Sequence, residues 1–224
     1  MHIGLIGGIG PAATEFYYRG LVKAHAAKNR KMALTIAHAD TREMVANMEA
    51  GENDKQARIF AGFTEQLKAG GCDAIAVTSM GGHFCINEFE KISVLPVLNA
   101  IPEMDAYFAQ LGVSRIGVLG SRVVMETKFY GGVTSVEVIA PPPKKLAAAH
   151  QEYIAMATAG IATDRQKEYF HKAGRKLCRK HGAEILVLGG TDLFLAFGDE
   201  DHGYPIVDSA QIHVDAIARV AMGC

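Results

Sequence analysis

The stretch HIGLIGG at residues 2–8 recurs in altered form as RIGVLGS at residues 115–121. Each copy mixes aliphatic residues with glycine after one polar residue, and each ends in a turn of small residues. A short apolar run that ends in glycine predicts a buried strand followed by a tight turn. The second copy begins 113 positions after the first, about half the length of the 224-residue chain. The sequence therefore predicts that one folding unit is repeated.

Other segments repeat at nearly the same spacing. The further pairs are GCDAIAV (71–77) with GAEILVL (182–188), LPVLN (95–99) with YPIVD (204–208) and, more weakly, residues 33–40 with 136–143. The first two of these pairs are offset by 111 and 109 positions. Buried parallel strands resemble one another in composition, so unrelated strands are the alternative explanation. The nearly constant offset favours a duplication.

Apolar runs alternate with amphipathic segments along the chain. The expected strands are 3–7, 33–39, 74–77 and 95–98, and the expected helices are 12–27, 59–69 and 101–110. This alternation indicates parallel sheets covered on both faces. We expect an α/β fold of two pseudo-symmetric lobes, each a parallel sheet flanked by helices, with an active-site cleft between them. The lobes are expected at residues 1–100 plus 208–224 and at residues 101–207.

Composition and charge exclude several classes of protein. Hydrophobic residues make up 49% of the chain, which is typical of a globular protein and not of a disordered one. The net charge of −1 argues against nucleic-acid or anionic-membrane partners. The sequence has no apolar run of 18 residues, and its first residues predict a strand and not a signal peptide. Four cysteines without CxxC spacing indicate free thiols in the cytoplasm.

The loops after the strands are the expected place for chemistry, because open parallel sheets bind ligands outside the carboxyl ends of their strands. Two such sheets would present their loops to one cleft. The loops are expected at residues 8–11, 40–42, 78–83, 121–126, 189–192 and 208–213.

In these strands and loops the sequence resembles the cofactor-independent aspartate/glutamate racemases over nearly the whole chain. The matching segments are GLIGGIGP at 4–11, GVLGSR at 117–122 with Met125-Glu126 and Phe129-Tyr130, LGGTDL at 188–193, and PIVDS at 205–209 with Ile212-His213. In that family two thiols act on opposite faces of the Cα carbon of an acidic amino acid, one as base and one as acid. The resemblance implies a small amino acid or carboxylate as substrate, no cofactor, and a homodimer.

The sequence departs from this family at both catalytic cysteines. The first motif of the family is Cys, an optional residue, Asn, and Ser or Thr, whereas this chain has TSMGGH at residues 78–83. Depending on the optional residue, Thr78 or Ser79 stands at the cysteine position, and Gly190 stands at the second. An alcohol is a very poor base unless a neighbour activates it, and glycine has no side chain. The two-thiol mechanism is therefore excluded for this sequence.

The strand-end loops supply the candidate site residues. The candidate catalytic positions are Thr78, Ser79, His83, Gly190 and Asp192, and the candidate substrate-binding residues are Ile9, Gly10, Pro11, Asp40, Thr41, Met80, Gly81, Ser121 and Thr191. Burial of Asp192 would raise its pKa and make it a general base, but an acid here also complements a helix dipole. For His83 the alternatives are an acid/base group and a ring bonded to the backbone. For Thr191 they are an anion-binding group and a helix cap.

Other binding motifs have weaker support. The turn at residues 7–10 lacks the full glycine patterns of nucleotide-binding loops, so we expect the following helix to receive a substrate carboxylate at its N-terminus. The scattered histidines argue against a metal site. Cys85 is the thiol nearest the loops, but buried cysteines are more typical of packing. Residues 141–143, three prolines, indicate a rigid connector.

Two functions remain open from the sequence. The first is a racemase-like isomerase that acts on a small carboxylate with altered acid/base groups. The second is a catalytically inactive carboxylate-binding or regulatory homologue. Proton exchange at Cα discriminates between them.

Overall fold

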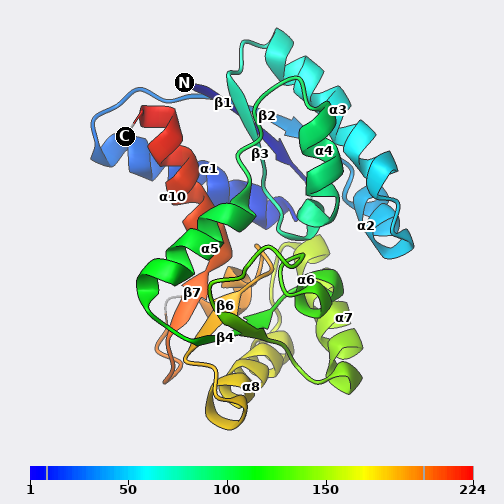
Figure 1. Ribbon diagram of the computed structural model, residues 1–224, viewed down its shortest axis with the longest axis vertical. Helices are drawn as coiled ribbons and strands as arrows, with labels where there is room; N and C mark the ends of the chain where they lie inside the picture. The colour runs from blue at the N-terminus through cyan, green and yellow to red at the C-terminus, as the bar shows by residue number, and fades with distance from the viewer. Residues whose placement is uncertain (9, 199, 224) are drawn as a thin grey trace.

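The computed structural model describes residues 1–8, 10–198 and 200–223, and its strands form two separate parallel sheets (Figure 1). The first sheet has the order β2-β1-β3, and its strands are β1 (His2–Gly7), β2 (Ala33–His38) and β3 (Ala74–Val77). The second has the order β5-β4-β6-β7, and its strands are β4 (Arg115–Leu119), β5 (Glu137–Ile139), β6 (Ile185–Leu188) and β7 (Ile206–Asp208). All strand pairs are parallel, as the sequence predicts.

Helices cover both faces of each sheet. In the first half they are α1 (Pro11–Ala27), α2 (Thr41–Ala50), α3 (Asn53–Ala69), the 3₁₀ helix η1 (Gly81–Cys85), α4 (Ile86–Ile92) and α5 (Ala100–Leu111). In the second half they are α6 (Arg122–Thr127), α7 (Pro143–Ala159), α8 (Asp164–His181), α9 (Phe194–Phe197) and α10 (Ser209–Met222). Figure 1 shows α10 returning from the lower sheet to lie beside α1.

The two sheets share one strand plan, which confirms the pseudo-symmetry. β1 and β4 hold equivalent central places, and β3 and β6 follow them on the same side. The hydrogen bonds repeat as well: Ile75 N donates to Pro96 O, and Leu186 N donates to Pro205 O, both at 2.9 Å. These pairs have the offsets of the sequence repeat.

The prediction of a strand at residues 95–98 is wrong. Pairing there is limited to one bridge between Ile75 and Val97, and Asn99 then caps α5 by accepting a hydrogen bond from Ile101 N at 3.0 Å. In the second half, β7 pairs with β6 over three residues before Asp208 caps α10 in the same way.

Three segments expected as loops instead begin helices. Asp40, Ser121 and Asp208 are N-caps whose side chains accept a backbone N–H of α2, α6 and α10, so the residues after them are helical. Helix α3 also begins at Asn53, six residues before the expected start, because the polar residues of its first turns carry no apolar periodicity. None of the helices in the described part of the chain is long and apolar enough to cross a membrane.

Alternate residues of the central strands face opposite helix layers. In β1, Ile3 and Leu5 pack with α1 and α10, whereas Gly4 lies under Leu67 of α3. In β4, Gly117 lies in the same way under Leu177 of α8. The equivalent glycines let a helix approach each sheet closely. The division into lobes at 1–100 plus 208–224 and 101–207 remains a prediction.

Substitution of these glycines tests that close approach. A Cβ on Gly117 would lie 3.1 Å from the Cβ atoms of both Leu177 and Ala183, which are fixed to the backbone. At Gly4 the nearest atom is the mobile Leu67 Cδ1, at 2.9 Å. We expect Gly117→Val to lower the free energy of unfolding by about 2–3 kcal/mol in urea titrations, and Gly4→Val by less.

A helical glycine provides the control. Nothing lies within 4 Å of a Cβ built on Gly62 in α3, so Gly62→Ala should stabilise the protein by about 0.5–1 kcal/mol. Equal losses at Gly4 and Gly117 would contradict the proposed difference between a mobile and a fixed neighbour.

Candidate functional site

A small cavity lies where strand-end loops from both halves of the chain meet. Its volume is about 20 Å³, enough for one water molecule. The lining residues are Gly10, Thr41, Met44, Val45, Met48, Ser79, Gly81, Ser121, Tyr153, Ile154, Ala157 and Thr158. Helices α2 and α7 both contribute side chains to its wall. The space is too small for an amino acid as it stands.

The internal symmetry bears on whether Thr78 or Ser79 matches the first cysteine position. Thr78 N donates to Ile6 O at 3.1 Å, and Gly189 N donates to Leu119 O at 2.7 Å, so Thr78 and Gly189 are equivalent. The next residues, Ser79 and Gly190, are then equivalent too. This correspondence favours Ser79 over Thr78 as the position of the first cysteine.

Ser79 also lies nearer the cavity than Thr78. The Ser79 hydroxyl accepts a hydrogen bond from Gly82 N at 3.2 Å, which leaves its own proton available to a ligand. The Thr78 hydroxyl is 3.1 Å from that of Thr14 and bonds within the first sheet. A Cβ built on Gly81 would be 3.5 Å from Ser79 Oγ and 3.8 Å from Ser121 Oγ. Two hydroxyls therefore flank one point of the cavity wall.

Tyr153 of α7 occupies the space beside Gly190. A Cβ built on Gly190 would overlap the Tyr153 ring, with Cζ only 2.6 Å away. Tyr153 is 4% exposed, and its hydroxyl donates to Asp192 Oδ2 at 3.3 Å. The ring thus fills the volume that a side chain at residue 190 would need. Sequence reasoning did not identify Tyr153, because nothing in the pattern of α7 shows which loop the helix contacts.

Asp192 is fully buried beside Gly10 and Tyr153. Its Oδ1 accepts a hydrogen bond from Ala13 N at 3.0 Å, in the first turn of α1. Burial raises the pKa of Asp192 to about 7, the negative charge of Asp208 adds to the rise, and the bonds from Ala13 and Tyr153 oppose it. The carboxyl group can therefore change its protonation state near neutral pH.

The N-terminus of α1 already holds a carboxylate in this structure. We expected a substrate carboxylate there, but Asp192 occupies the position, and any side chain at Gly10 would overlap it. The dipole of α1 and its free N–H groups favour this arrangement. The arrangement joins the loop after β6 to the first helix of the chain.

Two buried histidines are fully bonded within the protein. His83 Nδ1 donates to Ser79 O at 2.7 Å, and its Nε2 accepts from Ala100 N at 3.4 Å. His213 donates from Nε2 to Leu98 O and accepts from the Tyr17 hydroxyl at Nδ1. Burial lowers the pKa of His83 to about 4 and that of His213 to about 3. Both rings are therefore neutral, and His83 matches the backbone-bonded alternative.

The remaining candidate substrate-binding residues lie in different places, and most of them are outside the cavity lining. Asp40 caps α2, Pro11 begins α1 and faces an outer groove, and the Met80 side chain is packed in the hydrophobic core. Thr41 lines the cavity, and its hydroxyl donates to Gly8 O. Ile9 lies outside the described residues.

Thr191 and Cys85 are both buried. The Thr191 hydroxyl has no hydrogen-bond partner among the residues that the structure describes, and it caps no helix. Burial raises the pKa of Tyr153 well above its ordinary value, and the nearby Thr191 hydroxyl opposes that rise. Burial raises the pKa of Cys85 to about 12, so its thiol stays protonated. Within residues 1–8, 10–198 and 200–223, no three His, Cys, Asp or Glu side chains are grouped as a metal site requires.

Comparisons with known proteins give one consistent result. The model of the Asp/Glu/Hydantoin racemase family matches residues 6–217. A Yersinia pestis protein described as a candidate Asp/Glu racemase is 26% identical, with a TM-score of 0.83 over 99% of this chain and 100% of that chain. An aspartate racemase homologue from Pyrococcus horikoshii has 24% identity and a TM-score of 0.79 over 99% of each chain. Picrophilus torridus aspartate racemase has the same fold, at 18% identity and a TM-score of 0.77 over 99% and 95% of the two chains.

A double-mutant cycle tests the contact between Gly190 and Tyr153. Gly190→Cys should lower the free energy of unfolding by about 1–3 kcal/mol through overpacking, and Tyr153→Ala by about 3–5 kcal/mol through loss of a buried ring. In the double variant the thiol enters the vacated space, so the combined loss should be smaller than the sum by about 1 kcal/mol or more in urea titrations. Additive losses would show that the ring does not occupy this space.

The raised pKa of Asp192 predicts an unusual pH dependence of stability. Its folded pKa of about 7 exceeds the unfolded value of about 4, so the folded state binds more protons between these values. The free energy of unfolding should therefore fall as pH rises from about 4 to 7, by up to about 4 kcal/mol for this group. Asp192→Asn should make the decline shallower.

Asp54→Asn, at an exposed position in the first turn of α3, is the matched control and should leave the slope unchanged. Part of the decline of the unfolding free energy with pH should remain in the Asp192→Asn variant, because burial also raises the pKa of Asp208 to about 7. If Asp192→Asn shifts the whole curve without changing its slope, Asp192 is not the titrating group.

Proposed function

The chain belongs to the Asp/Glu/Hydantoin racemase family, and from this premise we propose that it binds a small amino acid or carboxylate between its two lobes and exchanges the proton at Cα. The observation that carries the proposal is the cavity lined by loops from both sheets, with two hydroxyls in its wall and a buried carboxyl group behind Gly10 and Tyr153. Substrate entry requires α2 and α7 to separate, because an amino acid is several times larger than the one water that fits.

The proposed binding groups are the hydroxyls of Ser79 and Ser121. Both are buried, and both lie beside Gly81, which has no side chain of its own, with Met48 Sδ nearby. A hydroxyl that donates to a substrate carboxylate also stabilises the negative charge that develops when the Cα proton leaves. Thr191 is a further donor in this proposal, since its buried hydroxyl lacks a protein partner among the described residues.

Asp192 is the proposed proton-transfer group. Its pKa of about 7 lets the carboxylate accept a proton and return it near neutral pH. Separation of α2 and α7 would also move Tyr153, which stands between Asp192 and the cavity. Ser79, at the position of the first cysteine, offers only an alcohol on the other side. The proposed chemistry is therefore one-sided, and deuterium should enter at Cα faster than the configuration inverts.

A catalytically inactive carboxylate-binding homologue is the second candidate. It is favoured by the contact of Asp192 with Ala13 N, which fills the helix N-terminus, and by the Tyr153 ring beside Gly190. In that case the cavity binds a ligand without a base that can reach Cα. Both candidates need no cofactor. We further propose a homodimer in the cytoplasm, where the free thiols of Cys72, Cys85 and Cys178 would stay reduced.

Exchange in D₂O tests the function. The protein is incubated with the L and D forms of aspartate and glutamate and with simple analogues, and NMR follows loss of the Cα–H signal and the enantiomer ratio. We expect exchange with little inversion, abolished by Asp192→Asn and retained in Asp54→Asn. Ser79→Ala should weaken binding about tenfold, the loss of one hydrogen bond to a charged group.

Each outcome decides between the candidates. Saturable binding without exchange supports the inactive homologue. Inversion at the same rate as exchange contradicts the one-sided mechanism. Neither binding nor exchange with any ligand contradicts both candidates.

A further inference from the structure

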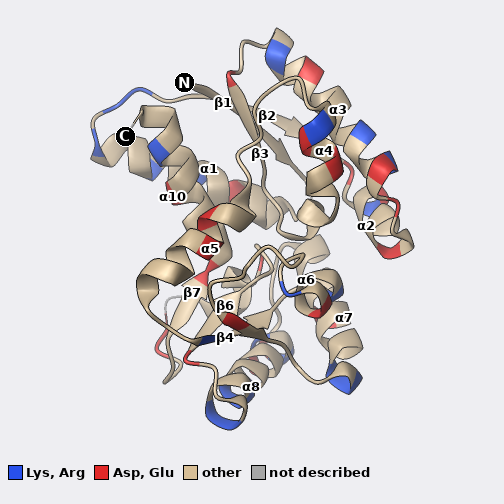
Figure 2. Cartoon of the chain, in the orientation of Figure 1, with Lys and Arg blue, Asp and Glu red and all other residues tan. Residues whose placement is uncertain are grey.

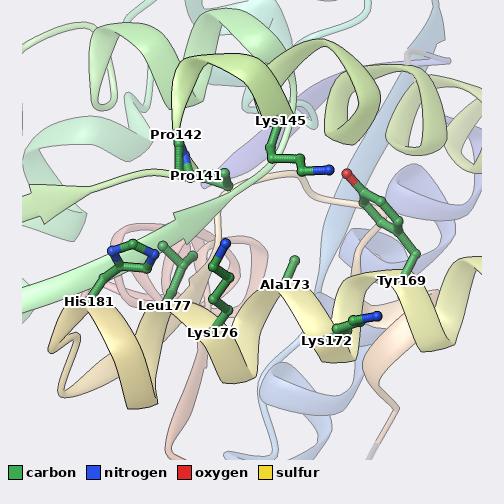
Figure 3. A pocket seen from close by; sticks show the side chains of 9 residues that line it. All are labelled: Pro141, Pro142, Lys145, Tyr169, Lys172, Ala173, Lys176, Leu177 and His181. Atoms are coloured by element: carbon green, nitrogen blue, oxygen red, sulfur yellow. The ribbon is translucent and has the colours of Figure 1, made fainter.

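A second cavity lies between α8 and the start of α7, the helix whose later turns line the first cavity. Its volume is about 250 Å³, near the lower end of small-molecule sites. Figure 3 shows the lining side chains on the two facing walls of this basic groove: Pro141, Pro142, Lys145, Tyr169, Lys172, Ala173, Lys176, Leu177 and His181. Six of them lie along one face of α8, at helical spacing, and the other three precede or begin α7.

The basic groove combines an apolar floor with a cationic rim. Pro141 and Leu177 are buried, and Tyr169 is half-buried beside the small Ala173, which leaves room above the helix. The three lysines are exposed. In Figure 3 Lys145 extends toward the Tyr169 hydroxyl, and Lys176 rises from α8 toward the two prolines. A flat apolar group fits the floor, and a negative group fits the rim.

The ammonium groups of this groove form no ion pair within the described chain. The groove lining contains no acidic residue there, although Lys172 also lines a neighbouring pocket with Asp164 and Glu168. The nearby carboxylate of Glu152 is held by Arg165, with N–O distances of 2.6 and 2.8 Å. Three free ammonium groups that share one groove repel one another, and an anion removes that cost.

Two helices add to the positive potential. The sequence of α8 contains seven Lys and Arg but only two acidic residues, in a chain whose net charge is −1, and Figure 2 shows this concentration of basic residues. The first turn of α7 has no acidic residue and no side-chain cap, and it carries Lys144 and Lys145 at the positive end of the helix dipole. Cations are unfavourable at that end, so a bound anion would stabilise both the lysines and the helix.

We infer that the basic groove binds a small phosphate ester with an aromatic ring, of the size of a nucleoside monophosphate. The ring would pack against Tyr169 and the face of Pro141, above Ala173. The phosphate would be held by the ammonium groups of Lys145, Lys172 and Lys176. This site is formed by helices of the second half, and it shares no lining residue with the cavity proposed for the amino acid, although α7 contributes to both.

Isothermal titration of the full chain with AMP tests this inference. Adenosine is titrated separately as the ring without the phosphate, and inorganic pyrophosphate as a more highly charged anion without the ring. We expect saturable AMP binding that weakens with added salt, and weaker binding of both fragments. The triple variant Lys145→Gln/Lys172→Gln/Lys176→Gln should reduce AMP affinity about tenfold or more. Ala173→Leu, which fills the floor, should reduce AMP affinity but leave pyrophosphate affinity unchanged.

Lys91→Gln, at an exposed site on α4, is the control and should bind AMP as the unaltered protein does. Equal affinity for pyrophosphate and AMP would overturn the role of the ring. Tighter binding of single-stranded DNA or an acidic peptide than of AMP would overturn the inference in favour of a macromolecular partner. Absence of AMP binding at low salt would overturn it outright.

Discussion

The buried carboxyl group of Asp192 joins the two halves of the molecule. It follows strand β6 of the second sheet, yet it accepts a hydrogen bond from Ala13 N at the start of α1, which follows strand β1 of the first sheet. A buried carboxyl group is stable only when its oxygens are bonded, and here Ala13 and Tyr153 supply the two donors. The positions of α1, α7 and the loop after β6 are therefore linked through one side chain. A movement of α7 that displaces Tyr153 would change one of these contacts.

The pseudo-symmetry of the two sheets explains the position of the candidate site, and their different side chains explain its asymmetry. Equivalent loops after β3 and β6 meet between the sheets, so Ser79 and Gly190 occupy matching places. Their surroundings then diverge. Ser79 keeps a hydroxyl at the cavity wall, whereas the Tyr153 ring has taken the space at Gly190. In the proposed mechanism the acid/base group on that side is Asp192, which lies behind Tyr153.

Net charge conceals how the charges are distributed. A value of −1 for the whole chain argues against a highly charged partner, but the average includes acidic residues far from α8. Folding brings the basic face of α8 against the first turn of α7, so that three lysines share one groove. The prolines before α7, which the sequence indicates only as a rigid connector, form part of its wall.

The sequence by itself determined the α/β class, the two related sheets and the helix α1, because strand and helix periodicity and the spacing of repeats are local properties. It also identified Ser79, Gly81 and Ser121 of the cavity wall, since strand-end loops of parallel sheets meet at one edge. Only the tertiary structure decided that Tyr153 fills the space at Gly190 and that Asp192 occupies the N-terminus of α1. It also decided that the imidazole rings of His83 and His213 are neutral. These properties depend on which distant segments of the chain are in contact and on how much water those contacts exclude. The local periodicity of the sequence determines neither.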